Sequence, residues 1–324
     1  MKYLFFDIEC AGVFKNVAKI CAFGYCLTDE QFHILEMKDI LINPKGGFHL
    51  TDRKGEKGLV LPYKYDEFKS YPTFPEVAPT IYGLLQDGDT LVAGHATMND
   101  VKYLNLETSR FSLPSFRFSF ADTQFLYMNK INVFSRQFGL GTIAQDLGVE
   151  FTPHRAVDDA YATMKIAEAI CKEEGMSFPE VLKKYEITFG RIENHEIQQT
   201  TSTAHKRHQE MIVKRKEERE QKRAEVHRYV DKTRKIRDKN GVLKGKRFCF
   251  SHVFEEQVEE AKTLIHQAFV LGCYYSYRAE ECEYYIALPS ENGARLKSAI
   301  AQKARVFTPE EFAEFLQKQG AGTD

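Results

Sequence analysis

The sequence predicts an α/β protein in two parts, a mixed sheet flanked by helices and, after a charged helical segment, a small second α/β domain. Segments rich in β-branched and aromatic residues come first and then alternate with amphipathic segments, the order of a mixed sheet covered by helices. Neither Gly nor Pro occurs between Ile192 and Asn240, where the chain is strongly polar. A length of 324 residues has room for about two domains.

Composition narrows the class of protein. Residues 204–247 contain 17 Lys or Arg and 7 Asp or Glu, so the rest of a chain with net charge −1 is acidic. The seven cysteines form no Cys-x-x-Cys pair, which argues against a zinc knuckle and a disulfide framework and favours free core thiols. No apolar run reaches the roughly 18 residues that cross a bilayer, and no leader precedes the first strand. We therefore expect a cytoplasmic protein with no membrane partner.

The first predicted strand, residues 2–10, ends in two acids. Side chains two positions apart in a strand point to the same face, so Asp7 and Glu9 project together. Two carboxylates at the end of an apolar strand repel each other and lose hydration, so one of them should be protonated unless a cation lies between them. Hard divalent cations such as Mg²⁺ or Mn²⁺ prefer such oxygen ligands. The alternative is a strand that simply runs out into a polar loop.

The next elements extend the sheet. Residues 18–28 and 31–43 are rich in β formers, and the Asp29-Glu30 pair between them predicts a hairpin. Three strands would then lie side by side, at least partly antiparallel. The polar segment 44–65, which contains several glycines, is long for a loop. It is either a surface excursion or a flap that contacts substrate.

Helices and strands alternate over the rest of the first domain, which should finish near residue 190. The expected elements are a helix opened by a Thr73–Glu76 capping box, a strand at 89–94, a helix to about 110, a strand at 118–121, a helix from 122, and helices at 139–147, from about 156, and at 177–185. In such sheets ligands bind where strands end. Asp7, Glu9 and Asp100 all lie at such ends.

Three motifs occur in order: Asp7-Ile8-Glu9, His95 with Asp100 five residues later, and His154 with Asp159 five residues later. The set resembles the DEDDh 3′-5′ exonucleases, the DnaQ-like group that includes the proofreading subunit of bacterial DNA polymerase III, ribonuclease T and oligoribonuclease. The resemblance implies a ribonuclease-H-like exonuclease domain over residues 1–190, two Mg²⁺ or Mn²⁺ ions, and His154 as general base. The implied metal ligands, which are also catalytic, are Asp7, Glu9, Asp100 and Asp159.

Phosphodiester hydrolysis by in-line attack explains why four acids and a histidine would occur together. It needs a metal-activated water and a second metal on the leaving oxygen, with the ions roughly 3.5–4 Å apart. A histidine with a pKa near neutrality suits a general base, although a histidine before a helix is otherwise a cap or a surface residue. Adjacent helical residues point about 100° apart, so Asp158 and Asp159 cannot serve the same ions equally. The family spacing selects Asp159, and the helix dipole accounts for Asp158.

Two positions depart from the common family pattern. Ala11 or Gly12 stands where many relatives carry Thr, and Asn99 stands where they carry Phe. Neither change removes a metal ligand, but both bear on how the terminal nucleotide is held. We expect His95 and Asn99 to contact substrate, with stacking by Phe14, for which core packing is the alternative.

The remaining chain predicts a basic helical linker at 191–243 and a βαββαβα domain at 244–320. The linker is either a solvated face or a contact for phosphates. The second domain resembles a BRCT domain in Gly245-Lys246-Arg247-Phe248-Cys249-Phe250, Gly272 and Glu310-Glu311-Phe312, although Ser251-His252 replaces the usual Thr-Gly and the chain has no Trp. Because BRCT domains bind phosphopeptides or DNA ends, Ser251 and Lys297 are candidates for a phosphate pocket, or else an ordinary strand-end Ser and exposed Lys.

Together these features predict a 3′-5′ exonuclease that hydrolyses DNA, from single-stranded or frayed 3′ ends, to nucleoside 5′-monophosphates in replication proofreading or repair. DNA is favoured over RNA because BRCT-like modules mostly accompany DNA transactions. A DNA polymerase or repair protein is the expected partner of the BRCT-like domain. The alternatives are an RNA 3′-end-trimming exonuclease and a non-catalytic scaffold that binds nucleic acid.

Overall fold

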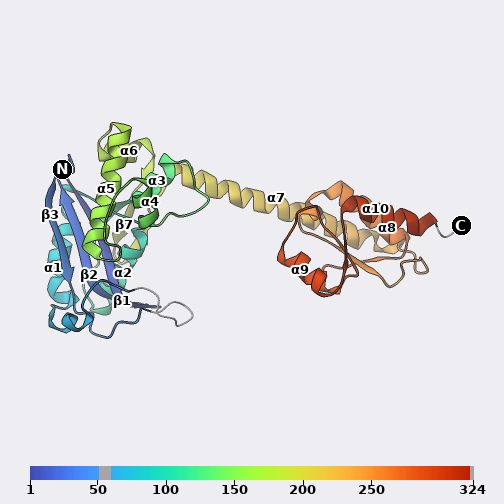
Figure 1. The fold of residues 1–324 in the computed structure, drawn as a ribbon, viewed down its shortest axis with the longest axis horizontal. Coiled ribbons are helices and arrows are strands. Elements are labelled where there is room, and N and C mark those ends of the chain that lie inside the picture. The colour runs from blue at the N-terminus through green and yellow to red at the C-terminus, as the bar shows by residue number, and fades with distance from the viewer. Residues whose placement is uncertain (51–59, 322–324) are drawn as a thin grey trace. The chain divides into compact units, whose positions relative to one another are not determined.

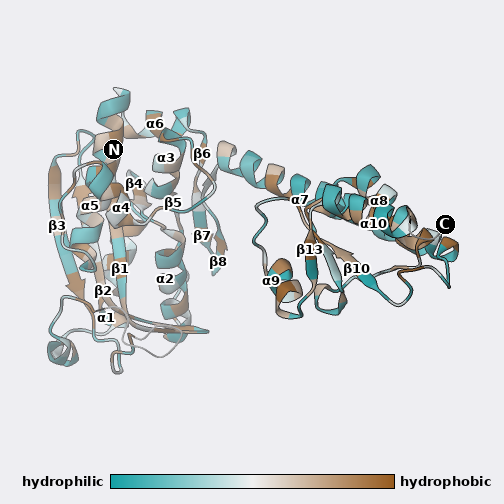
Figure 2. Ribbon diagram, turned by 45° about the vertical axis from the view of Figure 1, so that its right-hand side comes forward, coloured by the Kyte–Doolittle hydropathy of each residue, from teal (hydrophilic) through white to brown (hydrophobic). Residues whose placement is uncertain are grey.

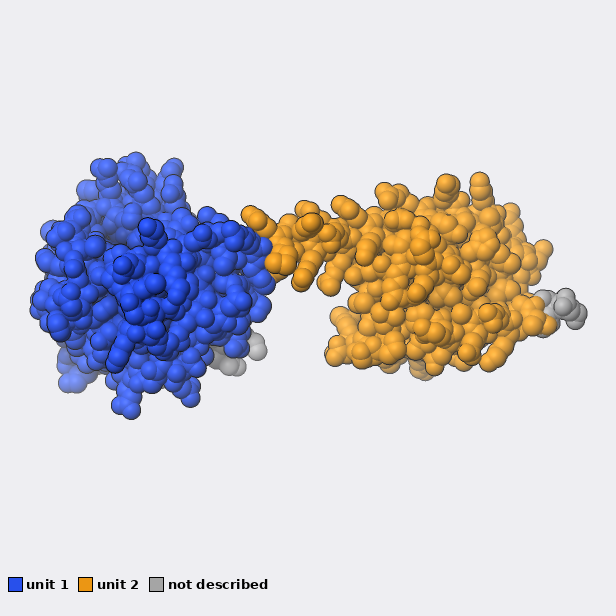
Figure 3. Space-filling view, turned by 90° about the horizontal axis from the view of Figure 1, so that it is seen from above, with its two compact units in different colours: residues 1–209 blue, residues 210–324 orange. Residues whose placement is uncertain are grey.

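The computed structural model describes residues 1–50 and 60–321 of the chain. They belong to two compact units, unit 1 (residues 1–209) and unit 2 (residues 210–324), each with hydrophobic cores of its own (Figure 3). Among the described residues, no helix is both long enough and apolar enough to cross a bilayer. All seven cysteines are free and buried, which confirms the prediction of core thiols.

Unit 1 is built on one mixed sheet, as predicted (Figure 1). Its strands are β1 (Lys2–Phe14), β2 (Val17–Thr28), β3 (Ile34–Leu41), β4 (Thr90–Gly94), β5 (Phe118–Asp122), β7 (Gly190–Glu193) and β8 (Glu196–Gln198). Within the described part of unit 1 they follow the order β3-β2-β1-β4-β5-β7-β8. The first three strands pair antiparallel, and β4 and β5 run parallel to β1. A short pair, β6 (Ile187–Thr188) with β9 (Thr201–Ser202), lies outside this sheet.

Helices cover both faces of the sheet. They are the 3₁₀ helix η1 (Tyr65–Ser70) and the α-helices α1 (Phe74–Leu85), α2 (Met98–Arg110), α3 (Thr123–Lys130), α4 (Leu140–Asp146), α5 (Ala156–Glu174) and α6 (Phe178–Lys184). Leu4 and Phe6 of β1 share a core with α1 and α2, whereas Tyr3 and Phe5 share a core with α5 and α6. Because side chains alternate along a strand, Asp7 projects from the face that α5 covers.

One glycine lets α5 approach the sheet closely. Gly24 of β2 pairs with Asp7 of β1 in the strand register. A Cβ atom at Gly24 would lie 2.0 Å from the backbone carbon of Ala156 and 2.1 Å from the nitrogen of Val157. Any larger residue would therefore push the start of α5 away from the strand that carries Asp7.

Unit 1 continues past the predicted end near residue 190. β7 pairs with β5 and β8 pairs with β7, so a hairpin adds to the edge of the sheet. Only Gly190 and Ile192 of β7 are buried, whereas Arg191 and Glu196 are exposed. Such short, mostly polar strands carry little of the apolar alternation by which strands are predicted.

The predicted charged helix is α7 (Thr203–Thr233), whose hydrophilic residues appear in teal in Figure 2. Its last two turns differ from the solvated linker that the sequence predicts. Val226 and Val230 are fully buried and share a core with Leu243 and Phe248 of unit 2. The C-terminal part of α7 is therefore an integral helix of unit 2.

The rest of unit 2 has the predicted βαββαβα order. Its elements are η2 (Arg234–Ile236), β10 (Arg247–Phe250), η3 (Phe254–Glu256), α8 (Val258–Val270), β11 (Tyr274–Tyr275), η4 (Ala279–Glu281), β12 (Tyr284–Ile286), α9 (Ala294–Ala301), β13 (Arg305–Phe307) and α10 (Pro309–Ala321). The strands form a parallel sheet in the order β11-β10-β12-β13. The capping box at the start of α10 forms as predicted, because Thr308 and Glu311 exchange hydrogen bonds.

The hydroxyl of Ser251, expected in a phosphate pocket, is used inside the fold. It donates to Glu291 Oε1 at 2.7 Å and accepts from the backbone N–H of Phe254 at 3.1 Å. Ser251 is only 1% exposed. The structure therefore favours the alternative for Ser251, an ordinary strand-end serine.

Candidate active site

The first two acids lie on the central strand of unit 1. β1 continues to Phe14 instead of running out into a loop after Cys10, and its pairing with β2 is irregular between Glu9 and Gly12. Irregular pairing of this kind, as in a β-bulge, bends a strand and re-aims its side chains. Glu9 is 9% exposed and Asp7 is half-buried, so both carboxyls lie at the edge of the core.

Asp100 reaches the same region from α2. It lies in the first turn of this helix, directly after the strand β4 that pairs with β1, and it is 5% exposed. Asp122, at the end of β5, accepts hydrogen bonds at 3.0 Å from the backbone N–H groups of Ala96 and Thr97. Asp122 thereby fixes the turn from which α2 and Asp100 start.

His154 and Asp159 come from the N-terminus of α5. One nitrogen of His154 and one carboxylate oxygen each of Glu9 and Asp159 all lie within 4.8 Å of one another. His154 has φ +67°, a left-handed backbone conformation that costs a non-glycine residue free energy and is often found at functional sites. Asp158, by contrast, forms an ion pair with Arg155 at 3.7 Å.

Contacts from two other elements hold the start of α5. The Tyr63 hydroxyl accepts a hydrogen bond from the backbone N–H of Ala156 at 3.0 Å and donates one to Asp39 Oδ2 at 2.9 Å. Arg155 Nε lies 3.7 Å from the same Asp39 oxygen. Tyr63 belongs to the long polar segment 44–65, expected as a surface excursion or a flap, of which residues 51–59 lie outside the described part of the chain.

Burial raises the pKa of all four carboxyls, and the charges of neighbouring acids in the group add to the shift for Asp7, Glu9 and Asp100. Burial and the charge of Asp7 raise the pKa of Glu9 to about 9. Burial raises the pKa of Asp159 to about 7, although a backbone hydrogen bond from His154 opposes the shift. Burial raises the pKa of Asp7 and of Asp100 well above the usual range, with Asp159 acting on Asp7 and Asp7 acting on Asp100. Carboxyl groups that repel in this way suit a hard divalent cation, so the residues fit the expected metal.

Asp7, Glu9, Asp100 and His154 line one cavity of about 680 Å³, and Asp159 lies beside it, next to Glu9 and His154. It is lined by Asp7, Ile8, Glu9, Cys10, Gly12, Val13, His49, Leu50, His95, Ala96, Asn99, Asp100, Tyr103 and His154. The predicted substrate residues His95 and Asn99 are thus on its wall. The described lining does not include Phe14, which is 50% exposed and packs its ring against His49.

His95 is fixed in place by both ring nitrogens. Nδ1 lies 3.1 Å from Thr123 Oγ1, and Nε2 lies 3.0 Å from the carbonyl oxygen of Phe138. Burial lowers the pKa of His95 to about 4, so the ring is neutral at pH 7. A ring whose two nitrogens are engaged in this way presents a rigid wall to the cavity.

Several residues of the site were not predicted from the sequence. His49, Leu50 and Tyr103 line the cavity, while Asp122 and Tyr63 hold the segments that carry the acids. Asp122 has a weak signal, since it ends an apolar strand much as Asp7 does. Tyr63 has none, because nothing in a polar loop indicates which helix it will contact.

A mixed α/β sheet with four converging carboxyls and a histidine beside one open cavity defines a hydrolase of the nuclease class. The chain belongs to the RNase T exonuclease family. The model of this family, described as "Exonuclease", matches residues 4–167, half of the chain and the part that contains every residue of the three motifs.

Solved structures with a similar fold include exonuclease I, at 18% sequence identity and a TM-score of 0.46 over 57% of this chain and 43% of that one. The complex of E. coli exonuclease I with a 5cy-dT13 oligonucleotide matches at 17% identity and a TM-score of 0.42, over 57% of this chain and 42% of that one. The chain therefore spans less than half the length of these proteins. No curated protein matches the chain.

Proposed function

We propose that the chain is a 3′-5′ exonuclease that hydrolyses DNA, from single-stranded or frayed 3′ ends, to nucleoside 5′-monophosphates. The observation that carries this proposal is that Asp7, Glu9, Asp100 and His154 line one cavity, with Asp159 close to Glu9 and His154, in a chain of the exonuclease family. These carboxyls come from one strand and the starts of two helices, so only the tertiary fold brings them close together. Their convergence supports a shared role in binding metal ions.

Asp7, Glu9, Asp100 and Asp159 would hold two Mg²⁺ or Mn²⁺ ions. When bound, the ions supply a nucleophilic water at neutral pH and charge stabilisation for the leaving oxygen. The four acids would balance the positive charge of these ions beside the cavity. His95 and Asn99 line the same cavity, so both can contact a terminal nucleotide that is bound beside the acids.

His154 is the proposed general base. Its side chain is 52% exposed and its Nδ1 lies 4.0 Å from Glu9 Oε1, so it can take a proton from a water at the acids and pass it to solvent. The water oxygen forms a bond to phosphorus while the bond to the leaving 3′ oxygen breaks, and that oxygen gains a proton. The products are a shortened strand with a 3′ hydroxyl and a nucleoside 5′-monophosphate.

The choice of DNA, and a role in proofreading or repair with a polymerase or repair protein as partner, rest on the BRCT-like sequence features at 244–320. Phe14 remains a proposed stacking residue that would have to turn toward the cavity. A cytoplasmic location remains a prediction from the sequence. RNA trimming uses the same chemistry and is the second candidate.

Degradation of 5′-labelled and 3′-labelled single strands tests the proposal. DNA and RNA of one sequence are incubated with Mg²⁺ or Mn²⁺ and with either the intact protein or Asp7→Asn. We expect the 5′-labelled DNA to shorten stepwise, the 3′ label to appear at once as mononucleotide, and Asp7→Asn to be inactive. Faster cleavage of RNA would select the second candidate. No cleavage of either polymer would favour the scaffold.

A further inference from the structure

Unit 2 contains a second cavity, of about 440 Å³, that the proposed reaction does not use. Four arginines and two partly exposed tyrosines line it: Arg234, Arg237, Arg247, Arg278, Tyr274 and Tyr277. We call it the arginine pocket. Its volume lies in the range of roughly 300–1,000 Å³ that small-ligand sites occupy.

The charge in the arginine pocket is unbalanced. Arg247 and Arg278 share one carboxylate, that of Glu281, at 3.4 and 3.2 Å. Arg234 pairs with Asp231 at 2.8 Å. Within the described part of the chain, no carboxylate pairs with Arg237. The arginine pocket therefore carries a net positive charge. An anion can bind to Arg237 without first breaking an ion pair.

Aromatic rings lie among these cations. Tyr274 is 39% exposed, and the guanidinium of Arg237 lies 3.6 Å from the centroid of its ring. Tyr277 is 37% exposed, and Arg234 donates a hydrogen bond to its hydroxyl at 3.3 Å. Cations that follow a sugar-phosphate backbone, interleaved with rings on which bases stack, are the usual means of binding single-stranded nucleic acid.

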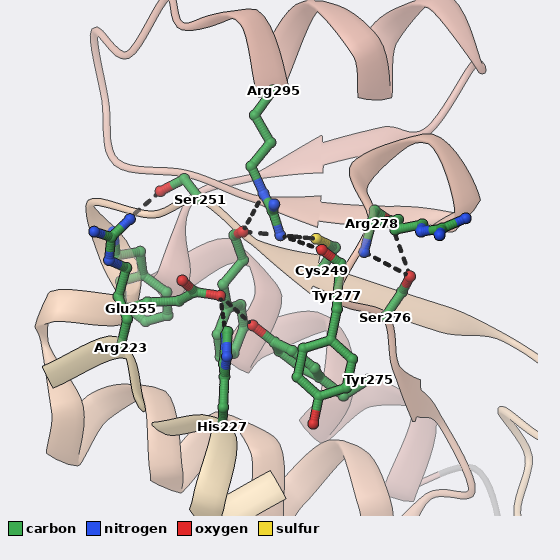
Figure 4. A network of polar contacts seen from close by, with 12 residues as sticks. Arg223, His227, Cys249, Ser251, Glu255, Tyr275, Ser276, Tyr277, Arg278 and Arg295 are labelled. Carbon is green, nitrogen blue, oxygen red and sulfur yellow. Dashed lines mark hydrogen bonds and ion pairs between the residues drawn. The ribbon is translucent and has the colours of Figure 1, made fainter. Parts of the chain in front are cut away.

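Hydrogen bonds from other parts of unit 2 hold the segment that carries Tyr275, Ser276 and Tyr277 (Figure 4). Arg295 donates a hydrogen bond to the carbonyl oxygen of Tyr277 at 3.0 Å. Ser276 Oγ accepts one from the backbone N–H of Arg278 at 3.2 Å and donates one to its carbonyl oxygen at 2.9 Å. The Tyr275 hydroxyl donates to the buried carboxylate of Glu255 at 2.6 Å. The pocket wall is therefore organised before any ligand binds.

We propose that the arginine pocket binds single-stranded nucleic acid through its phosphates and bases, as a second site that retains the strand. A nucleic acid strand offers a phosphate and a flat base at every nucleotide, and so can engage arginines from three separate segments together with both tyrosines. A phosphopeptide with one phosphate would use few of these groups. The inference that the strand is substrate rests on the proposed function, but binding at this pocket does not.

Binding to full-length protein tests the proposal. The parent is Asp7→Asn without divalent cation, so that a fluorescent oligothymidylate stays intact. Adding Arg237→Gln should weaken binding about five-fold at 0.1 M salt and lower the slope of log K against log salt by about 0.7, the loss of one phosphate contact on a single strand. Arg305→Gln is the matched control. Arg305 also lies over an aromatic ring, 4.4 Å from the centroid of Phe307, but it belongs to β13, the strand at the other edge of the sheet.

Three results would overturn the proposal: unchanged affinity in Arg237→Gln, an equal loss in Arg305→Gln, or displacement of the oligonucleotide by a phosphoserine peptide at lower concentration than by unlabelled oligonucleotide. Unchanged melting temperatures show that the variants fold. Cleavage of a trinucleotide by protein with Asp7 intact separates the two proposals. If Arg237→Gln weakens binding while the intact protein cleaves nothing, the arginine pocket stands and the nuclease proposal fails.

Discussion

His154 combines a left-handed backbone, a half-exposed ring and a neighbouring buried carboxyl. As general base it acts on the rate of the chemical step and contributes little to the fold. We expect His154→Gln to lower the single-turnover rate of cleavage roughly 100-fold or more. The matched control is His33→Gln, which alters an exposed histidine that pairs with Asp29 in the β2–β3 hairpin.

Single-turnover cleavage and thermal unfolding together check this prediction. His33→Gln should retain the full rate, and both variants should keep the melting temperature of the parent. A His154→Gln variant with the parental rate would remove the assigned base.

Because His95 is buried, we expect the folded protein to lose stability in acid. Its pKa is about 4 in the folded protein, because of burial, against an ordinary value of 6.5. Below pH 6.5 the unfolded chain binds a proton that the folded ring does not, so stability falls as the pH drops and stops falling near pH 4. At pH 5 this group alone should cost about 2 kcal/mol relative to pH 7.

Urea unfolding of the parent and of His95→Gln at pH 7 and pH 5 isolates this contribution, because all other groups are common to both proteins. The difference in unfolding free energy between the two pH values should be smaller in His95→Gln. Equal differences would mean that His95 titrates normally.

At the residue scale the sequence predicted the acids and His154 because their spacing is a property of the chain alone. The structure brings Glu9, His154 and Asp159 together and puts Asp158 in an ion pair with Arg155. Asp122 and Tyr63 were not predicted because they act on backbone N–H groups of distant segments. Such contacts depend on tertiary packing, for which no local pattern exists.

Among the elements, α5 depends on the space above Gly24. We expect Gly24→Ala to move the start of α5 and with it His154 and Asp159, lowering stability by about 1–3 kcal/mol through overpacking. Activity should fall more than stability does, since catalysis needs the acids in register. The control is Gly83→Ala in α1, where an added Cβ would meet nothing within 4 Å.

Gly83→Ala should leave activity intact and raise stability by roughly 0.5–1 kcal/mol, because alanine favours the helix. Denaturant unfolding and initial cleavage rates measure both effects. A fully active Gly24→Ala would show that the close approach of α5 to β2 is unnecessary.

Element prediction succeeded where local signals are strong. The capping boxes of α1 and α10 and the apolar stripe of α5 each specify a helix from its own residues. It failed for the β7–β8 hairpin, whose polar strands are stabilised by joining the edge of an existing sheet. Edge strands of this kind are extended because they pair with the neighbouring strand, and their own residues give little signal for a strand.

On the scale of the whole molecule, α7 begins in unit 1 and ends in the core of unit 2. We expect Val230→Asp to destabilise unit 2 by several kcal/mol, since it places a charge among fully buried apolar side chains. Unit 1 has separate cores, so its unfolding and the cleavage of a trinucleotide should be unaffected. Calorimetry of the full chain should resolve the two transitions, of which only one shifts.

A matched Val213→Asp change, at an exposed position of the same helix, should shift neither transition. If Val230→Asp moves both transitions equally, the units fold as one. The sequence predicted α7 as a helix but not the burial of its end, because two valines among many charged residues form no continuous apolar stripe. The predicted boundaries of the linker, near residues 190 and 243, were based on the polarity of the sequence. The two compact units of the structure divide near residue 209.

The proposed reaction depends on four particular carboxyls, and the two adjacent acids of α5 allow a sharp comparison, because only one of them belongs to the four. Asp159 is 7% exposed and lies in the cluster, whereas Asp158 pairs with Arg155. Single-turnover cleavage of a 5′-labelled strand should fall roughly 100-fold or more in Asp159→Asn, in line with the loss of one electrostatic contact in a catalytic site, and stay within a few-fold of the parent in Asp158→Asn. Equal losses in the two variants, or a fully active Asp159→Asn, would contradict the role of Asp159 as a metal ligand.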